Sequence, residues 1–243
     1  MSPPVPKTAM VFAAGLGLRM RPITDTLPKP LVRIAGRALL DHAIDRLAAA
    51  GVERVVVNVH YLGDIIAEHL AARNSPEIVI SREAAALETG GGVKHALALL
   101  SDAPFYVVNG DSLWLDSKVS ALVRLADAWD PATTDAMLLL QRTATAVGYG
   151  EGPGDYTLDQ VGRPRRRHER EVAPYLFAGV QLLSPALFEG MPEGPFSLNR
   201  IYDKAERSGR LGALVHDGEW YHVSTPDGLK LVEHRLHSRR VER

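Results

Sequence analysis

Short apolar segments of strand length alternate with segments of helical periodicity through the first half of the chain. Residues 9–14 and 52–58 have the apolar character of buried strands, and residues 39–50 between them carry apolar side chains at helical spacing. A second amphipathic segment at 65–72 precedes another short strand at 77–81. Because this alternation is typical of parallel strands joined by right-handed crossovers, the sequence predicts an α/β fold with a mixed, mostly parallel sheet.

The later segments are less regular. A helix is expected at 92–100, starting from a run of glycines, and another at 198–208. Strands are expected at 135–141 and 176–183. The segment 147–170 contains five glycines and two prolines, which is typical of a loop.

Composition excludes several classes of protein. The chain has 28 Lys and Arg against 29 Asp and Glu, a balance that argues against a dedicated nucleic-acid binder. It has no cysteine, so disulfides, thiol catalysis and cysteine-bound zinc are excluded. No stretch approaches the roughly 20 apolar residues that span a membrane, and the first residues lack the apolar segment of a secretion signal. These features predict a cytoplasmic protein with no nucleic-acid or membrane partner.

A glycine-rich turn follows the first expected strand directly. Gly15 and Gly17 let backbone N–H groups approach an anion, and Arg19 and Lys29 add positive charge over the same phosphates. The spacing is neither that of a dinucleotide-binding turn nor that of a Walker A loop, since prolines interrupt it and no Lys-Ser/Thr follows the glycines. We therefore predict a phosphate site here; the alternative is a plain turn followed by a solvated lysine.

These residues resemble the signature of the sugar-1-phosphate nucleotidyltransferases, in which Gly-x-Gly-x-Arg precedes Pro-Lys-Pro, here Pro28-Lys29-Pro30. Three later segments are similar to that family in the same order: 87–92, 108–111 and 220–226. The resemblance covers roughly residues 10–236. The Glu-Thr-Gly-Gly-Gly sequence starting at Glu88 is most similar to the N-acetylmuramate-1-phosphate uridylyltransferases.

The resemblance implies a three-layer α/β/α Rossmann-like nucleotidyltransferase domain spanning residues 1–243. It divides into a nucleotide-binding part at about 8–134, a sugar-binding part at about 135–226 and a C-terminal helix at about 227–243. The implied reaction joins a nucleoside triphosphate to a sugar-1-phosphate and releases pyrophosphate. The implied substrates are UTP and N-acetylmuramic acid α-1-phosphate, in a cell-wall sugar recycling route. The alternatives are a mannose-1-phosphate guanylyltransferase and a glucose-1-phosphate thymidylyl- or uridylyltransferase.

The resemblance also assigns roles to individual residues. Arg19 binds the triphosphate, Lys29 binds the α-phosphate or the sugar phosphate, and Asp111 binds Mg²⁺. Backbone groups of Gly90 and Gly91 read the base edge. The full set of expected nucleotide-binding residues is Ala13, Ala14, Gly15, Gly17, Glu88, Thr89, Gly90, Gly91 and Asn109, and the expected sugar-binding residues are Gly154, Glu171 and Gly179.

Several of these residues have simpler explanations. Asp111 follows a glycine and could be a turn residue or a helix cap, and residues 88–92 could be a flexible loop. The basic run 163–170 is expected to be a solvated loop, with a position near the sugar phosphate as the alternative. The tryptophans are expected to pack in the core rather than stack on a base.

The chain departs from the family pattern at the late motif. His222 stands where a second magnesium carboxylate is usual, and Ser224 replaces a glycine. An imidazole suits Mn²⁺ better than Mg²⁺, so three interpretations follow. Asp111 and the phosphates alone hold the metal, His222 joins them, or the chain is a non-catalytic subunit that binds nucleotide-sugars. The sequence does not predict the oligomeric state.

Overall fold

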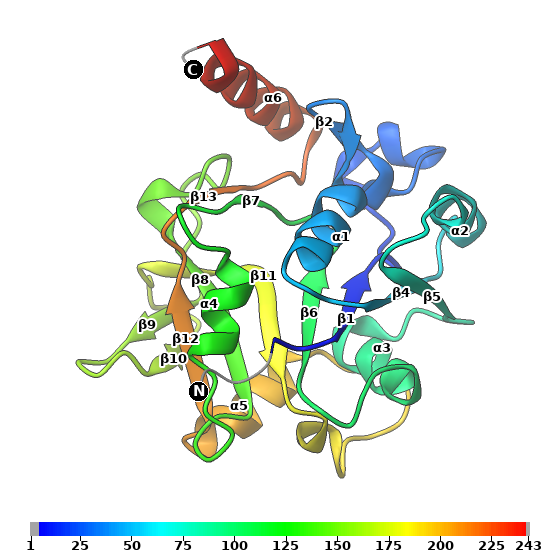
Figure 1. The fold of residues 1–243 in the computed structure, drawn as a ribbon. Helices are drawn as coiled ribbons and strands as arrows, with labels where there is room; N and C mark the ends of the chain where they lie inside the picture. The colour runs from blue at the N-terminus through cyan, green and yellow to red at the C-terminus, as the bar shows by residue number, and fades with distance from the viewer. Residues whose placement is uncertain (1–4, 242–243) are drawn as a thin grey trace.

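The computed structural model describes residues 5–241 (Figure 1). The strands are β1 Thr8–Phe12, β2 Arg33–Ile34, β3 Arg37–Ala38, β4 Arg54–Val59, β5 Glu77–Arg82, β6 Phe105–Asn109, β7 Leu113–Leu115, β8 Ala136–Arg142, β9 Tyr156–Leu158, β10 Pro164–Arg166, β11 Tyr175–Leu183, β12 Leu211–Val215 and β13 Glu219–Tyr221. The helices are α1 Leu39–Ala49, α2 Gly63–Ala71, α3 Glu88–Ala96, α4 Ala121–Asp127, α5 Asn199–Arg207 and α6 Pro226–Val241.

One mixed sheet runs through the described residues. Strands β6, β1, β4 and β5 are parallel neighbours in that order. Strand β11 pairs antiparallel with β6 on one side and with β8 on the other, and β12 lies parallel to β8. The antiparallel pair β9–β10 is attached to the start of β11. A single antiparallel strand thus joins the two halves of the chain in one sheet.

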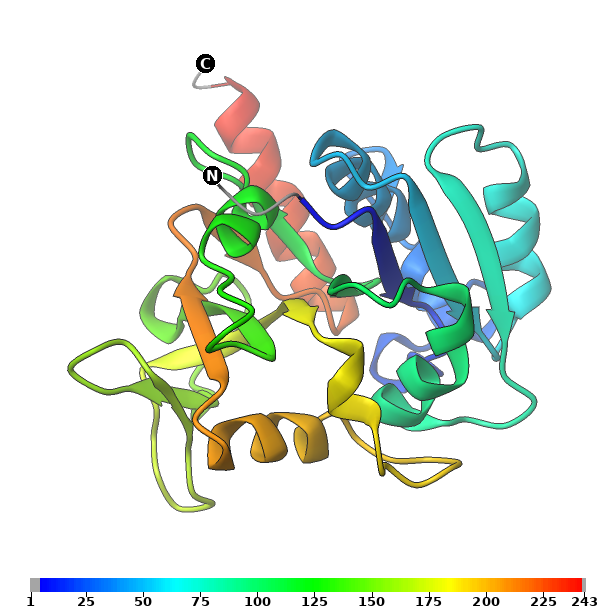
Figure 2. The same ribbon diagram turned by 60° about the horizontal axis from the view of Figure 1, so that its bottom comes forward.

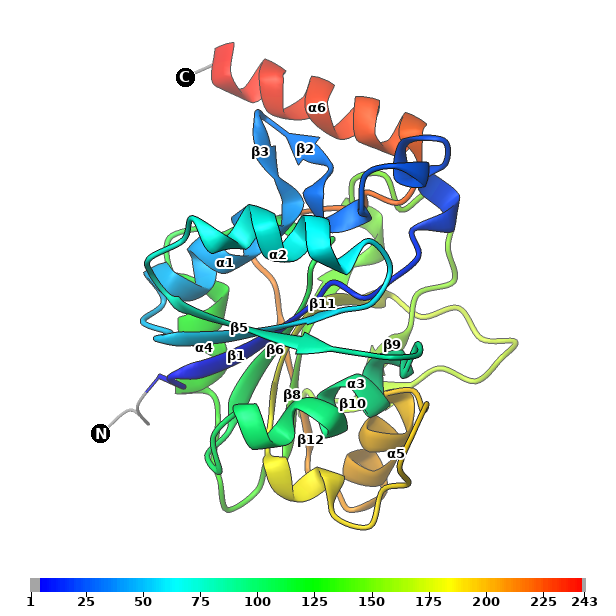
Figure 3. The same ribbon diagram turned by 90° about the vertical axis from the view of Figure 1, so that its right-hand side faces the viewer.

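Helices cover both faces of this sheet, giving three layers. Along β1, Ala9 and Val11 point to the face covered by α1, α2 and α4, whereas Met10 points to the face covered by α3 and α5. This alternation is the period of two expected for a strand buried on both faces. Figure 3 shows α1 and α2 on one side of the strands and α3 and α5 on the other.

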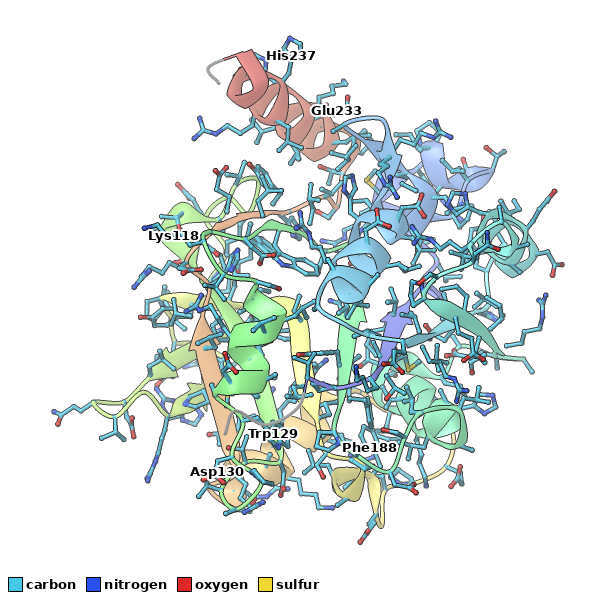
Figure 4. All side chains as sticks on the ribbon, viewed as in Figure 1. Lys118, Trp129, Asp130, Phe188, Glu233 and His237 are labelled. Atoms are coloured by element: carbon cyan, nitrogen blue, oxygen red, sulfur yellow. The ribbon has the colours of Figure 1, made fainter. Side chains whose placement is uncertain are left out.

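A third apolar cluster closes one end of the molecule. Val232 of α6 packs with Ile34 of β2 and with Leu113 and Tyr221 of the β7–β13 pair. Glu233 and His237 lie on α6, at the opposite end of Figure 4 from Trp129 and Phe188. None of the described helices is long and apolar enough to cross a membrane.

The α/β fold with a mostly parallel sheet is confirmed, with several corrections. The segment 147–170 is not all loop, because β9 and β10 pair within it, and β12 was missed. Helix α3 begins at Glu88 rather than Gly92, so the glycines lie inside its first turns. The C-terminal helix is present to Val241; residues 242–243 lie outside the described part.

The three tryptophans are core residues, as predicted. Trp114 is fully buried, and Trp129 and Trp220 are nearly so. The Trp114 ring lies under the guanidinium of Arg46.

Gly179 lies at an irregularity of β11, where the register with β8 shifts between Phe177 and Gln181. Its φ is +76°, a conformation that favours glycine. A Cβ at this position would lie 2.1 Å from Oγ of Ser112 and 2.9 Å from Nδ2 of Asn109. The bulge therefore brings Gly179 against the side chains of Ser112 and Asn109, which would have to turn aside to admit a Cβ.

Gly179→Ala is expected to lower the free energy of unfolding by roughly 2 to 4 kcal/mol, measured by urea denaturation. Gly36→Ala is the matched control, because Gly36 also has positive φ (+84°) but has no atom within 4 Å of the added Cβ. This control should lose only about 1 kcal/mol. If both variants lost the same free energy of unfolding, the side chains of Ser112 and Asn109 would have moved aside without cost.

Candidate active site

Three strand ends converge where the sequence predicted the phosphate site. In the sheet register, Phe12 at the end of β1 stands opposite Asn58 of β4 on one side and Asn109 of β6 on the other. The segments that follow β1 and β6 therefore leave the sheet side by side. This edge is where ligands bind in parallel α/β sheets.

The contact between these two segments is very close. The N–H of Gly110 donates to the carbonyl of Phe12 at 3.0 Å. A Cβ on Gly110 would lie 2.3 Å from that oxygen, so glycine is required for the approach. The next residue, Asp111, is thereby held beside the glycine-rich segment after β1.

Lys29 and Asp111 form an ion pair, with Nζ and Oδ2 2.5 Å apart. The Lys29 side chain is 12% exposed and that of Asp111 is 37% exposed. Lys29 lies in a short 3₁₀ turn that begins after Pro28, so its backbone position is restrained. The lysine and the carboxylate therefore face the same space, as the sequence predicted.

Two cavities meet at this pair, and the larger of the two has a volume of about 570 Å³. Arg19 lines it together with Lys29, Asp111 and Thr89. The other lining residues are Phe12, Ala13, Gly15, Leu16, Gly17, Leu18, Met20, Pro30, Asn109, Gly110 and Ser224. Of the predicted nucleotide-binding residues, Ala13, Gly15, Gly17, Thr89 and Asn109 thus lie at one cavity, and Ala14 lies between two lining residues.

A smaller cavity, of about 230 Å³, shares part of its wall with the larger one. Arg19, Asn109 and Asp111 line both. The smaller cavity is also lined by Gly179 and His222. Further lining residues are Ser112, Tyr149, Asp155, Leu176, Phe177, Trp220, Tyr221 and Val223. One ligand can therefore lie in each cavity, with the shared wall of Arg19, Asn109 and Asp111 between them.

His222 is held among aromatic rings and charges. Its ring stacks on Trp220 and meets Tyr149 edge-on, with centroids 5.7 and 6.1 Å apart. Burial lowers the pKa of His222, and the charges of Arg19 and Lys29 lower it further, while Asp111 opposes them. These surroundings therefore favour the neutral form of the imidazole, which has a lone pair for a metal ion.

The shared wall offers one carboxylate, that of Asp111, as a ligand for magnesium. The described residues contain no group of three or more His, Asp or Glu side chains placed to hold a metal ion. Mg²⁺ is nevertheless commonly held by one or two carboxylates, with substrate phosphates and water completing its shell. Asp111, at the wall between the two cavities, fits that pattern.

The N–H groups of the α3 glycines, predicted to lie at the base edge, have partners within the protein in this structure. The N–H groups of Gly90 and Gly91 both donate to the carbonyl of Phe196, at 2.7 and 3.0 Å. These are helix N-terminal donors, which need an acceptor outside the helix. These two donors are therefore satisfied within the protein, and the role of Gly90 and Gly91 at the base stays a prediction. Glu88 is exposed, with φ of +56°, and lines neither cavity.

Two predicted sugar residues also lie outside both cavities. Glu171 accepts from the N–H of His168 and pairs with Arg165, and these contacts lower its pKa in that order of importance. The carbonyl of Gly154 accepts a hydrogen bond from Nε of Arg167. Among the three predicted sugar residues, Gly179 alone lines the smaller cavity.

Sequence reasoning missed a buried network behind the glycine-rich segment. Asn58 accepts the N–H of Ala13 through Oδ1 and donates through Nδ2 to Glu83, at 2.9 and 2.7 Å. The second oxygen of Glu83 accepts the N–H of Leu87 just before α3. Both residues lie at carboxyl ends of neighbouring parallel strands, β4 and β5, which was a signal available in the sequence.

Comparison with known proteins agrees with this geometry. The family model described as nucleotidyl transferase matches residues 8–151. A protein of Caulobacter vibrioides named N-acetylmuramate alpha-1-phosphate uridylyltransferase is 45% identical, over 95% of this chain and 97% of its own length. The chain belongs to the nucleotidyl transferase family. The predicted membership of the sugar-1-phosphate nucleotidyltransferases is thus confirmed, and the chain is an enzyme of that class.

Two further comparisons extend this result. A protein of Neisseria meningitidis serogroup B with the same name is 33% identical, over 91% of this chain and 95% of its own. A solved structure of a UDP-glucose pyrophosphorylase complexed with UDP-glucose superposes with a TM-score of 0.80 at 16% identity. It covers 96% of this chain and 99% of that chain. This likeness confirms the Rossmann-like fold.

Glu83→Gln is expected to lower the free energy of unfolding by about 1 to 3 kcal/mol, because the new amide must turn a donor toward the N–H of Leu87 or toward Asn58. Since Asn58 also holds Ala13, the KM for the nucleotide should rise. Urea denaturation and initial rates measure the two effects. Glu77→Gln, on the same strand but exposed and paired with Arg54, is the control and should change stability by less than about 1 kcal/mol. An unaffected Glu83→Gln protein would exclude a structural role for the network.

Proposed function

We propose that this enzyme transfers the uridylyl group of UTP to N-acetylmuramic acid α-1-phosphate, giving UDP-N-acetylmuramate and pyrophosphate. The proposal places the reaction in the cytoplasm, in the recycling of cell-wall sugars. Support for the choice of substrates comes from the two relatives that share this printed activity and span nearly the whole chain. The alternatives are a guanylyl transfer to mannose-1-phosphate and a thymidylyl or uridylyl transfer to glucose-1-phosphate.

One observation carries the mechanism: the two cavities share a wall that contains Arg19, Asn109 and Asp111. Lys29 is ion-paired to that wall. A triphosphate in the larger cavity and a sugar phosphate in the smaller one would meet at it. Holding two anions together in this way supplies most of what a phosphoryl-group transfer needs from a protein.

The residues then have distinct tasks. An oxygen of the sugar phosphate attacks the α-phosphorus of UTP, and the bond between the α-phosphorus and its bridging oxygen to the β-phosphate breaks. The electron pair leaves with pyrophosphate. Arg19 stabilises the charge on the leaving pyrophosphate, and Lys29 orients the α-phosphate or the attacking phosphate. Asn109 contacts the ribose or a water that the metal ion would carry.

Asp111 is the residue that would hold Mg²⁺ at this wall. When bound, the ion offsets the negative charge of the phosphates. His222 faces the smaller cavity as a neutral imidazole and is the second candidate ligand, one that favours Mn²⁺.

The substrate assignment is tested by measuring pyrophosphate release with a panel of nucleoside triphosphates and sugar-1-phosphates, in Mg²⁺ and in Mn²⁺. UTP with N-acetylmuramic acid α-1-phosphate is expected to give the highest kcat/KM. A higher value for GTP with mannose-1-phosphate, or for dTTP or UTP with glucose-1-phosphate, would replace the proposal with that alternative. Nucleotide binding without release from any pair would indicate a non-catalytic subunit.

Asp111→Asn is expected to reduce kcat by at least about 100-fold, because the charge at the shared wall is lost and the shape is kept. The variant should still fold, with a small loss of stability from the broken ion pair with Lys29. Asp25→Asn is a suitable control, since Asp25 pairs with Arg21 on the surface of the same glycine-rich segment. Its rate should match the wild-type rate. A near-normal rate for Asp111→Asn would remove Asp111 from the mechanism.

A further inference from the structure

A third cavity continues the site beyond the smaller one. It has a volume of about 430 Å³ and shares Asp155 and Phe177 with the smaller cavity. The β9–β10 hairpin lies beside α5 in both Figure 1 and Figure 2, and this cavity lies between them, with Arg166 and Arg167 on one side and Tyr202 on the other. A substrate in the smaller cavity therefore has room to extend a substituent toward the hairpin.

The two arginines of this cavity differ in their partners. Arg166 forms a two-pronged ion pair with Asp203 of α5, at 2.7 to 2.9 Å. Its charge is therefore compensated, and it fastens the hairpin to the helix. Its neighbour Arg165 pairs with Glu171 outside the cavity.

Arg167 has no carboxylate partner among the described residues. Its Nε donates to the carbonyl of Gly154 at 2.7 Å, and its Nη1 donates to the carbonyls of His168, Glu169 and Glu171. These four neutral oxygens fix the guanidinium but leave its positive charge uncompensated. No hydrogen bond from Nη2 is present within residues 5–241.

The acidic residues that line this cavity leave that charge available. The carboxylate of Asp155 accepts the N–H of Phe177, and no ion pair joins Asp155 to Arg167 in the described part of the chain. The side chain of Glu169 is exposed. A fixed, partly buried guanidinium with a free edge is suited to bind a carboxylate.

We infer that Arg167 recognises a carboxylate on the sugar and so determines which sugar-1-phosphate is used. The inference rests on the proposed function: N-acetylmuramic acid differs from N-acetylglucosamine by a lactyl ether that ends in a carboxylate. In this arrangement the phosphate of the sugar lies at the shared wall, and the lactyl group reaches through the smaller cavity to the hairpin. Arg167 is then a specificity-determining residue that takes no part in bond making.

The test compares N-acetylmuramic acid α-1-phosphate with N-acetylglucosamine α-1-phosphate, each with UTP, in the full-length enzyme. Arg167→Met should raise the KM for the muramic acid substrate by about 10- to 100-fold. The kcat/KM for the glucosamine substrate should change by less than about threefold. Arg167→Lys, which keeps the charge, should recover part of the lost preference.

Arg170→Gln is the matched control. It removes one charge from the same basic run, but Arg170 is exposed and lines none of the three cavities. Its kinetics with both sugars should equal those of the wild type. If Arg170→Gln raised the KM for the muramic acid substrate as much as Arg167→Met does, the overall charge of the basic run would be what attracts the substrate. That result would overturn the inference.

The outcomes separate the two proposals. A wild-type enzyme without preference for the muramic acid substrate contradicts both the proposed function and the role of Arg167. If Arg167→Met keeps the wild-type preference, or loses kcat/KM equally with both sugars, only the role of Arg167 is contradicted. Arg167 would then serve only to hold the loop through its hydrogen bonds to the carbonyls.

If Arg167→Met does not fold, Glu169→Gln decides instead. This change removes the negative charge of a residue that lines the same cavity and leaves the carbonyl of residue 169 in place. It should lower the KM for the muramic acid substrate a few-fold and leave that for the glucosamine substrate unchanged. Unchanged selectivity would overturn the inference.

Discussion

The contact between Gly110 and the carbonyl of Phe12 is the constraint on which the site depends. Because no side chain fits between β1 and the residue that follows β6, the two segments leave the sheet in contact. The ion pair of Lys29 and Asp111 then joins them a second time, through side chains of opposite charge. The shared wall of the two cavities is built on these two contacts, and the remaining side chains are arranged around it.

Much of this could be predicted from the sequence, for a physical reason. Apolar strands that alternate with amphipathic helices define a parallel sheet, and parallel strands deliver their carboxyl ends to one edge. The glycine-rich segment after β1 was therefore expected at that edge, and the family resemblance predicted that Arg19 and Asp111 meet there. The same rule also applied to Asn58 and Glu83, but neither lies in a glycine-rich segment or in a motif that indicates a ligand site.

What the sequence could not give is the choice of distant partners. Gly90 and Gly91 are small because the segment around Phe196 packs against them, more than 100 residues later in the chain. Glu171 is an exposed carboxylate whose position depends on the β9–β10 hairpin, a short pairing hidden in a glycine-rich segment. In the basic run, Arg166 is paired with Asp203 of α5 whereas Arg167 has no carboxylate partner in the described part of the chain, and this difference depends on where α5 lies. Local pattern carries no information about such contacts.

Strand β11 has a consequence for how the enzyme moves. It is hydrogen-bonded to β6 from Phe105 to Val108 and to β8 on its other edge, so a hydrogen-bonded ladder links the first half of the chain to the second. Rotation of one side against the other about a hinge would break that ladder. Rearrangement of the loops at the sheet edge, including opening of the ion pair between Lys29 and Asp111, is the motion that this hydrogen bonding leaves free.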